Sequence, residues 1–186
     1  TAAEATNLQI ELAKLGFTAQ EIKDSTQYIL RFAQATGAEL PDAASLAGAA
    51  LRMFGASTKE TERYVSAMAV STSRSALSFS YLATAMPIVG PVAKSFNFTI
   101  EDTLALLGKL SDAGFDASMA ATATRNILLN LADSNGKLAK TLGEPVKTLP
   151  DLVNGLVKLR DNGVDLNTTL ELTDKRSVSA FNAFLT

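Results

Sequence analysis

The residue types that carry most enzymatic chemistry are missing from this chain of 186 residues, which contains no histidine and no cysteine. This composition excludes catalysis by a serine–histidine–aspartate or a cysteine–histidine set. It also excludes disulfide bonds and the usual zinc sites. Ser134 and Lys137 have the Ser-x-x-Lys spacing of some acyl-transfer enzymes, but the companion motifs of those enzymes do not occur here.

The acidic residues offer no better catalytic site. Glu101 and Asp102 are adjacent, and neighbouring residues on a helix diverge by about 100°. They therefore suit the first turn of a helix, where acids interact favourably with the helix dipole, rather than an acid–base pair. The stretch that follows Asp133 fails as a calcium loop because Gly136 stands at its fourth position instead of the sixth. The sequence predicts no enzyme, no cofactor and no metal ion.

The overall composition indicates a folded protein. Hydrophobic residues make up 47% of the chain and charged residues 19%. The formal net charge is −2, and the basic residues are scattered, so we expect no specific nucleic-acid partner. Much of the hydrophobic share is alanine, which predicts thin cores. The chain begins at Thr1 in helix-like sequence without a signal peptide, and we interpret it as a piece of a longer protein.

Capping signals divide the sequence into short helices. Helix starts are predicted where a hydroxyl residue precedes an acid by three positions, as in Thr18 with Glu21, Ser57 with Glu60 and Thr99 with Asp102. Helix stops are predicted at Gly37, Gly55 and Gly114. In the helix that follows Thr18, we expect Ile22, Leu30 and Ala33 to share the buried face.

These signals predict an all-α fold with about 8–10 helices and no sheet. Similar turn sequences start at Gly16, Gly55 and Asn97, at intervals of roughly 40 residues, which is typical of stacked helical hairpins. The similarity is weak, and we favour an irregular bundle of antiparallel helical hairpins over a regular stack. We expect residues 1–186 to form one domain, with a possible subdivision near the polar loop 133–149.

The apolar stretch Ser75–Ala93 admits three interpretations. It contains no charged residue, and Pro87 and Pro91 lie four residues apart. A membrane span needs roughly 20 mostly apolar residues, but interior prolines leave carbonyls without helical partners. We expect a core helix that Pro87 kinks or ends and Pro91 restarts, with Gly90 permitting the joint. A membrane span and a ligand pocket are the alternatives.

Several stretches together resemble the core region of phage tail tape measure proteins, a minor tail protein family. They are Leu12–Ile22, Ala35–Gly55, Leu82–Ala132 and Leu149–Leu159. Within the third stretch, the segment Val89–Ala93 is followed by the Ala113-Gly114 turn and by Arg125, in the order of the family. The similarity covers nearly the whole chain in register.

The resemblance implies a structural and assembly protein in the tail of a phage or prophage. Tape measure proteins set tail length and occupy the tail tube during assembly. The implied partners are therefore tail tube and tail tip proteins, tail assembly chaperones and further copies of the same chain. The implied location is the virion tail, assembled in the cytoplasm of the bacterial host. The alternative is a membrane-interacting segment that assists genome delivery into the host, for which membrane contact is required.

The capping pattern adds an expectation about shape. A molecular ruler suits uninterrupted helical heptads, whereas caps, glycines and prolines interrupt this sequence roughly every 15 to 20 residues. We therefore interpret the chain as a compact helical domain that folds outside the tail tube and rearranges or unfolds to fit within it. An unfolding free energy well above the typical range of about 5–15 kcal/mol would count against this hypothesis.

Overall fold

The computed structural model describes residues 1–143, 145–173 and 175–186. In these residues the chain forms helices and no strand. The α-helices are α1 (Ala2–Lys14), α2 (Ala19–Thr36), α3 (Leu40–Phe54), α4 (Thr61–Arg74), α5 (Phe79–Ser95), α6 (Ile100–Asp112), α7 (Ala117–Ala132), α8 (Lys137–Leu142), α9 (Leu149–Asp161), α10 (Leu166–Leu172) and α11 (Val178–Leu185), and a short 3₁₀ turn, η1 (Thr58–Glu60), precedes α4.

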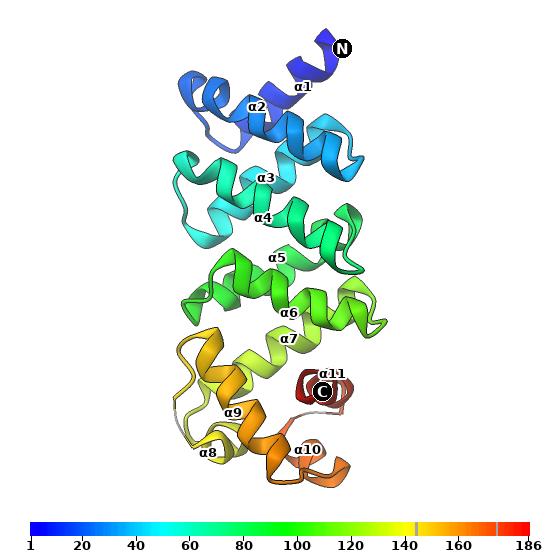
Figure 1. Cartoon of the computed structure of the whole chain (residues 1–186). Coiled ribbons are helices and arrows are strands. Elements are labelled where there is room, and N and C mark those ends of the chain that lie inside the picture. Colours follow the sequence, from blue (N-terminus) through cyan, green and yellow to red (C-terminus); the bar gives the residue numbers. More distant parts are fainter. Residues whose placement is uncertain (144, 174) are drawn as a thin grey trace.

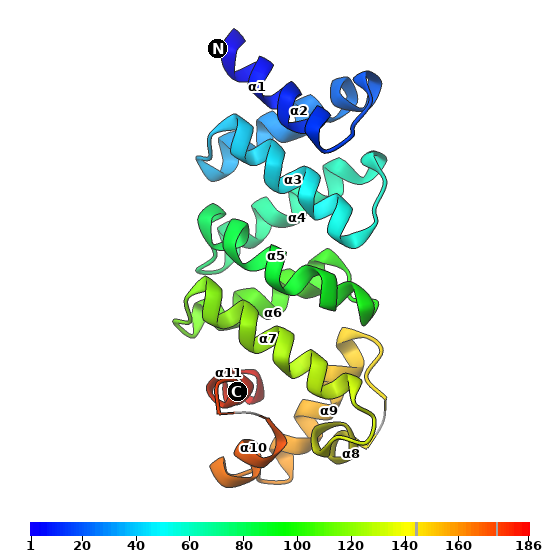
Figure 2. The same cartoon turned by 180° about the vertical axis from the view of Figure 1, so that it is seen from behind.

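The first seven helices form two layers that run the length of the molecule (Figure 1). Helices α1, α3, α5 and α7 pack side by side in one layer, which faces the viewer in Figure 2. Helices α2, α4 and α6 pack side by side in the other layer. Because each helix returns antiparallel to the one before it, the chain is a stack of helical hairpins, with the N-terminus at one end.

The all-α class and the antiparallel hairpins predicted from the sequence are confirmed. The described residues form eleven α-helices, slightly more than the expected 8–10. The hairpins from α1 to α7 follow the stacked arrangement that we considered less favoured than an irregular bundle. The weak turn repeat was therefore the better guide to the arrangement of the helices.

The turns after α1, α3 and α5 lie along one edge of the stack and share one geometry (Figure 1). We call this edge the Gly16 edge. After α1, the N–H of Phe17 donates to the carbonyl of Leu12 over 3.0 Å, and Gly16 has φ +81°. The equivalent bonds after α3 and α5 are Ala56 to Leu51 at 2.8 Å and Phe98 to Ala93 at 3.0 Å. Asn97, with φ +56°, occupies the position of Gly16 in the third turn, since asparagine tolerates the left-handed region better than most residues.

Capping boxes set the start of the helices that follow two of these turns. The Thr18 hydroxyl accepts from the Glu21 N–H at 3.3 Å, and the Glu21 carboxylate accepts from the Thr18 N–H at 2.8 Å. Thr99 and Asp102 form the same pair before α6. Ser57, by contrast, precedes the 3₁₀ turn and makes no capping bond through its side chain, so α4 starts at Thr61 without the predicted box.

Small residues allow the helices of the odd-numbered layer (α1, α3, α5 and α7) to approach closely. Ala43, Ala47 and Ala50 are fully buried within this one chain. A side chain at Gly48 would clash with Leu15, the residue that follows α1, and one at Gly90 would meet the Met53 sulfur of α3 at 3.1 Å. Glycine and alanine at these crossings therefore let neighbouring helices pack at short separation.

The buried face of α2 differs from the predicted one. Leu30 is 43% exposed, whereas Ile29 and Phe32 are fully or almost fully buried. Ala33 is buried as expected, and Ile22 is half-buried. The prediction was wrong at Leu30 because α2 packs against α4, α3 and α1, and the face that these neighbours cover carries Ile29 and Phe32 instead.

The chain after α7 does not continue the regular stack. The helix α9 lies on the same side as α6, and α11 packs against α6, α7 and α9 (Figure 1). Ala180 and Phe181 of α11 are fully buried, so this helix covers the end of the core that the stacked hairpins leave open. Glu144, within the predicted polar loop 133–149, lies outside the described residues.

Candidate functional site

A groove of about 700 Å³ runs between α4 and α6 on the even-numbered face of the stack, which α2, α4 and α6 form. Ser66 and Val70 line it from α4, and Ala105 and Gly108 line it from α6. Because Ser66 and Ala105 have small side chains and Gly108 has none, the two parallel helices leave a furrow between them. Val70 is 48% exposed inside it. We call this feature the α4–α6 groove.

Arg63 joins the two helices at one end of the groove. Its Nε and Nη2 atoms donate to the two carboxylate oxygens of Glu101 over 2.7 and 2.8 Å, and Nη1 donates to Glu60 over 3.0 Å. The guanidinium also lies 5.9 Å above the Tyr64 ring centre. Hydrogen bonding to Arg63 lowers the pKa of Glu101. Since both partners are about half exposed, the pair fixes the position of α6 against α4 more than it stabilises the fold.

The opposite end of the groove is basic. Arg74 and Lys109 lie there, and neither forms an ion pair with a described residue. The carboxylate of Asp112, at the same end, accepts the N–H of Ala76 over 2.6 Å. This bond ties the turn after α4 to the end of α6.

Two polar contacts join α2 to the start of α4. The Ser25 and Thr61 hydroxyls lie 3.1 Å apart in a buried position. The Glu21 carboxylate, already bonded to Thr18, also accepts the hydroxyl of Thr58 at 2.9 Å. The Thr18 and Thr58 bonds lower the pKa of Glu21, because they favour its charged form.

Tyr81 connects α5 to the turn before α7. Its hydroxyl donates to the Phe115 carbonyl over 3.0 Å. Burial, together with the nearby Asp116 charge, raises the pKa of Tyr81 to about 12. Tyr81 is thus a neutral donor at neutral pH, and its ring fills space between the helices.

Sequence inspection alone missed these contacts between hairpins, because each one joins residues far apart in the chain. The separations are 36 residues for Ser25 and Thr61, 37 for Glu21 and Thr58, and 38 for Arg63 and Glu101. These separations are close to the spacing of the turn repeat. The repeat was therefore the signal that could have located them.

The predicted kink residues lie within one continuous helix. α5 runs from Phe79 to Ser95 through Pro87 and Pro91, so the helix neither ends at Pro87 nor restarts at Pro91. Both prolines are exposed, so the carbonyls that lack helical partners lie on the side of α5 that faces solvent. Gly90 is buried against α3. A bend at these three positions stays a prediction.

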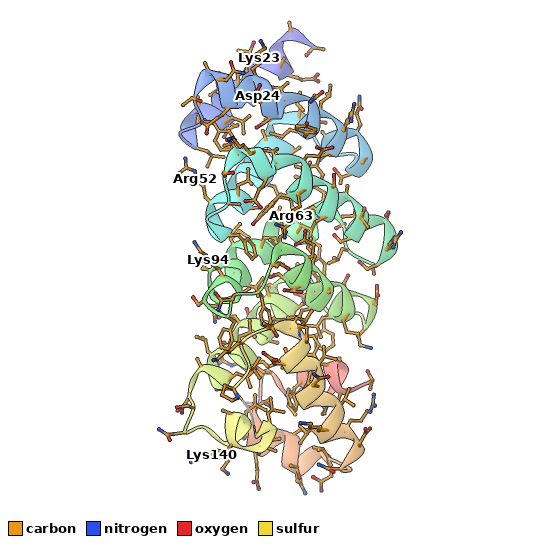
Figure 3. All side chains as sticks on the ribbon, turned by 60° about the vertical axis from the view of Figure 1, so that its left-hand side comes forward. Lys23, Asp24, Arg52, Arg63, Lys94 and Lys140 are labelled. Carbon is orange, nitrogen blue, oxygen red and sulfur yellow. The ribbon has the colours of Figure 1, made fainter. Side chains whose placement is uncertain are left out.

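The predicted helix stops follow three different helices. Gly37, Gly55 and Gly114 have φ values of +70°, +66° and +86° after α2, α3 and α6. Only Gly55 lies on the Gly16 edge. There, a side chain at Gly55 would clash with the ammonium of Lys94, and one at Gly16 would lie 2.7 Å from the Arg52 guanidinium. Figure 3 shows Arg52 and Lys94 on this edge, in neighbouring hairpins.

The polar residues considered for chemistry lie at helix starts and in a turn: Glu101 and Asp102 are in the first turn of α6, and Asp133 and Ser134 precede α8, which begins at Lys137. The Asp133 carboxylate accepts the Asn135 N–H at 3.0 Å, and the Lys137 ammonium lies 3.5 Å from Glu171. Across the part of the chain that the structure describes, no three acidic residues gather to hold a metal ion. None of the helices formed by the described residues combines the length and apolarity that crossing a membrane requires.

Comparison with known proteins identifies the family. The model of the phage-related minor tail protein family matches residues 1–182. The tape measure protein of Pneumococcus phage Dp-1 is 28% identical over 168 residues, which cover 90% of this chain and 15% of that protein. The probable tape measure protein of Escherichia phage P2 is 29% identical over 144 residues, which cover 77% of this chain and 18% of that protein. No solved structure matches.

The family match extends along almost the entire length of this all-helical chain and therefore defines its class, that of phage minor tail proteins. The chain belongs to the family of phage-related minor tail proteins. The resemblance inferred from the sequence is therefore confirmed. The chain spans less than a fifth of the length of each of the two relatives.

Proposed function

We propose that this chain is a compact section of a tape measure protein, which helps to set tail length and to assemble the tail tube. The observation that carries this proposal is the similarity to two proteins named as tape measure proteins, over 90% and 77% of the chain. The role is structural, and the proposal includes no catalytic step.

The fold supports a compact section rather than the extended part of a ruler. The first seven helices are 13 to 18 residues long, and each reverses direction at a closed turn. A single helix of 186 residues would span about 280 Å, far more than a stack of hairpins. We propose that this section folds before it enters the tube, and that it rearranges there.

The partners follow from the same proposal. They are tail tube and tail tip proteins, tail assembly chaperones and other copies of this chain. The place of action is the virion tail, after assembly in the host cytoplasm. The scattered charges of the chain favour protein partners over nucleic acid.

An in-frame deletion tests the proposal in the phage or prophage that encodes this chain. Removing the codons for residues 1–182 should abolish tails or change their length by up to about 280 Å, as measured by electron microscopy of purified particles. Peptides of this chain should also be found in purified wild-type tails by mass spectrometry. A matched Ser73→Ala variant, at an exposed position, should leave tails unchanged. Infectious particles with normal tails after the deletion would overturn the proposal.

A further inference from the structure

The α4–α6 groove has an apolar centre that is open to solvent. Val70 is 48% exposed there. Ser66, Ala67 and Ala105 surround it with small side chains, and the almost completely buried Leu104 lies at its floor. The small neighbours leave Val70 accessible to a second apolar surface.

The two ends of the groove carry opposite charge. At the end where α4 and α6 begin, Glu101 lines the groove and Glu60 lies beside it, so that these two carboxylates outnumber the Arg63 guanidinium that binds both. At the end where both helices finish, Arg74 and Lys109 outnumber Asp112, whose carboxylate already accepts a backbone N–H. The groove is thus acidic at one end, apolar in the middle and basic at the other end.

This charge order is self-complementary under a two-fold rotation. If two copies face each other with their α4 helices antiparallel, the basic end of each copy lies over the acidic end of the other. The apolar centres then coincide, and the two Val70 side chains cover each other. An interface of this type uses the same patch on both copies, and complementary charges select the antiparallel orientation.

We propose that the α4–α6 groove is a self-association surface that pairs two copies of this chain about a two-fold axis through Val70. The proposal deepens the self-association included in the proposed function and rests on it. Because the test below needs only the purified chain, its failure would leave the tail-length experiment unaffected. A small groove gives a weak dimer, whose dissociation constant we expect to be roughly micromolar or weaker.

Sedimentation equilibrium of the purified chain at increasing concentration tests the pairing. The wild-type chain should approach twice its monomer mass of 19.6 kDa, and added salt should weaken the association. Val70→Lys places two charges at the centre and should raise the dissociation constant at least tenfold. Leu129→Lys, on the odd-numbered face and 50% exposed, is the matched control and should associate like the wild type. A monomer at millimolar concentration, or equal association of the Val70→Lys variant, would overturn the proposal.

A charge exchange tests the antiparallel orientation. Arg74→Glu with Lys109→Glu makes both ends of the groove acidic, and each homodimer then opposes like charges. Glu60→Lys with Glu101→Lys makes both ends basic. Neither variant should pair with itself, but a mixture of the two should form a heterodimer, because each contact then joins opposite charges. If circular dichroism shows that the second variant is not folded, Glu60→Lys alone replaces it. Absence of the heterodimer between two folded variants would refute the two-fold arrangement.

Discussion

Residues 1–132 and residues 137–186 are both helical, but their helices are held in different ways. In the first region the helices contain 13 to 18 residues, and each is enclosed by neighbours from its own layer and from the facing layer. In the second region α8, α10 and α11 contain only 6, 7 and 8 residues. Helices this short are not stable by themselves in water, so the second region depends on packing against the end of the stack.

The contrast extends to the polar contacts. Neighbouring hairpins in residues 1–132 are joined by buried or bidentate bonds such as Ser25 to Thr61 and Arg63 to Glu101. The ion pair of Lys137 and Glu171 in the second region is about 70% exposed on both sides and contributes little. In residues 1–132 similar contacts recur from hairpin to hairpin, so the stabilising interactions are spread along the stack. The terminal region instead depends on the packing of one helix, α11, against α6 and α7.

Core truncations should give the largest difference between the regions. Leu107→Ala in α6 and Leu152→Ala in α9 each remove a buried side chain and should cost about 2–5 kcal/mol. Hydrogen exchange should show lost protection from α3 to α7 in the first variant. In the second variant the loss should be confined to α8–α11. Loss of protection throughout the chain in both variants would show that the two regions unfold as one unit.

Valine at a left-handed glycine should have the next largest effect. Gly55 has φ +66° on the Gly16 edge, and Gly143 has φ +78° after α8, where a side chain would meet nothing within 4 Å. Both substitutions strain the backbone by about 1–2 kcal/mol, but Gly55→Val also displaces Lys94. Urea unfolding should therefore show the larger loss of stability for Gly55→Val. An unchanged midpoint for this variant would show that the turn tolerates a side chain.

Removal of a helix cap should cost about 1 kcal/mol in either region. Thr99 caps α6 and Thr148 caps α9, each within a capping box. Thr99→Ala should lower the melting temperature of the stack, whereas Thr148→Ala should change only local hydrogen exchange in α9. A fall in the melting temperature of the stack after Thr148→Ala would contradict the separation of the two regions.

The smallest expected effect is the dependence on pH in the first region. Hydrogen bonds lower the pKa of Glu21 and of Glu101 from the ordinary value of 4.5. A lowered pKa in the folded state means that these carboxylates stabilise the fold above pH 4.5 and that this contribution is lost as the pH falls through the folded value. The variant Glu21→Gln with Glu101→Gln should lose less stability than the wild type between pH 5 and pH 3 in urea titrations. Parallel curves would contradict the pKa shifts.

Local signals in the sequence predicted the fold class and several helix boundaries. The capping boxes at Thr18 and Thr99 depend on residues three positions apart, so the sequence reveals them directly. The buried face of α2 was less predictable, because the helices that cover Ile29 and leave Leu30 exposed are other parts of the chain. The same reason hid the Arg63–Glu101 bridge. Pro87 and Pro91 interrupt a helix in isolation, but their exposed position lets the helix of this fold continue through them.

The closed turns of the stack also determine how much length each residue contributes. One hairpin of roughly 40 residues advances the stack by one helix spacing, about 8–10 Å, whereas the same residues in one straight helix would span about 60 Å. Opening a single hairpin would therefore lengthen the chain by about 50 Å. Under a pulling force, the stack would extend in steps of this size, one hairpin at a time.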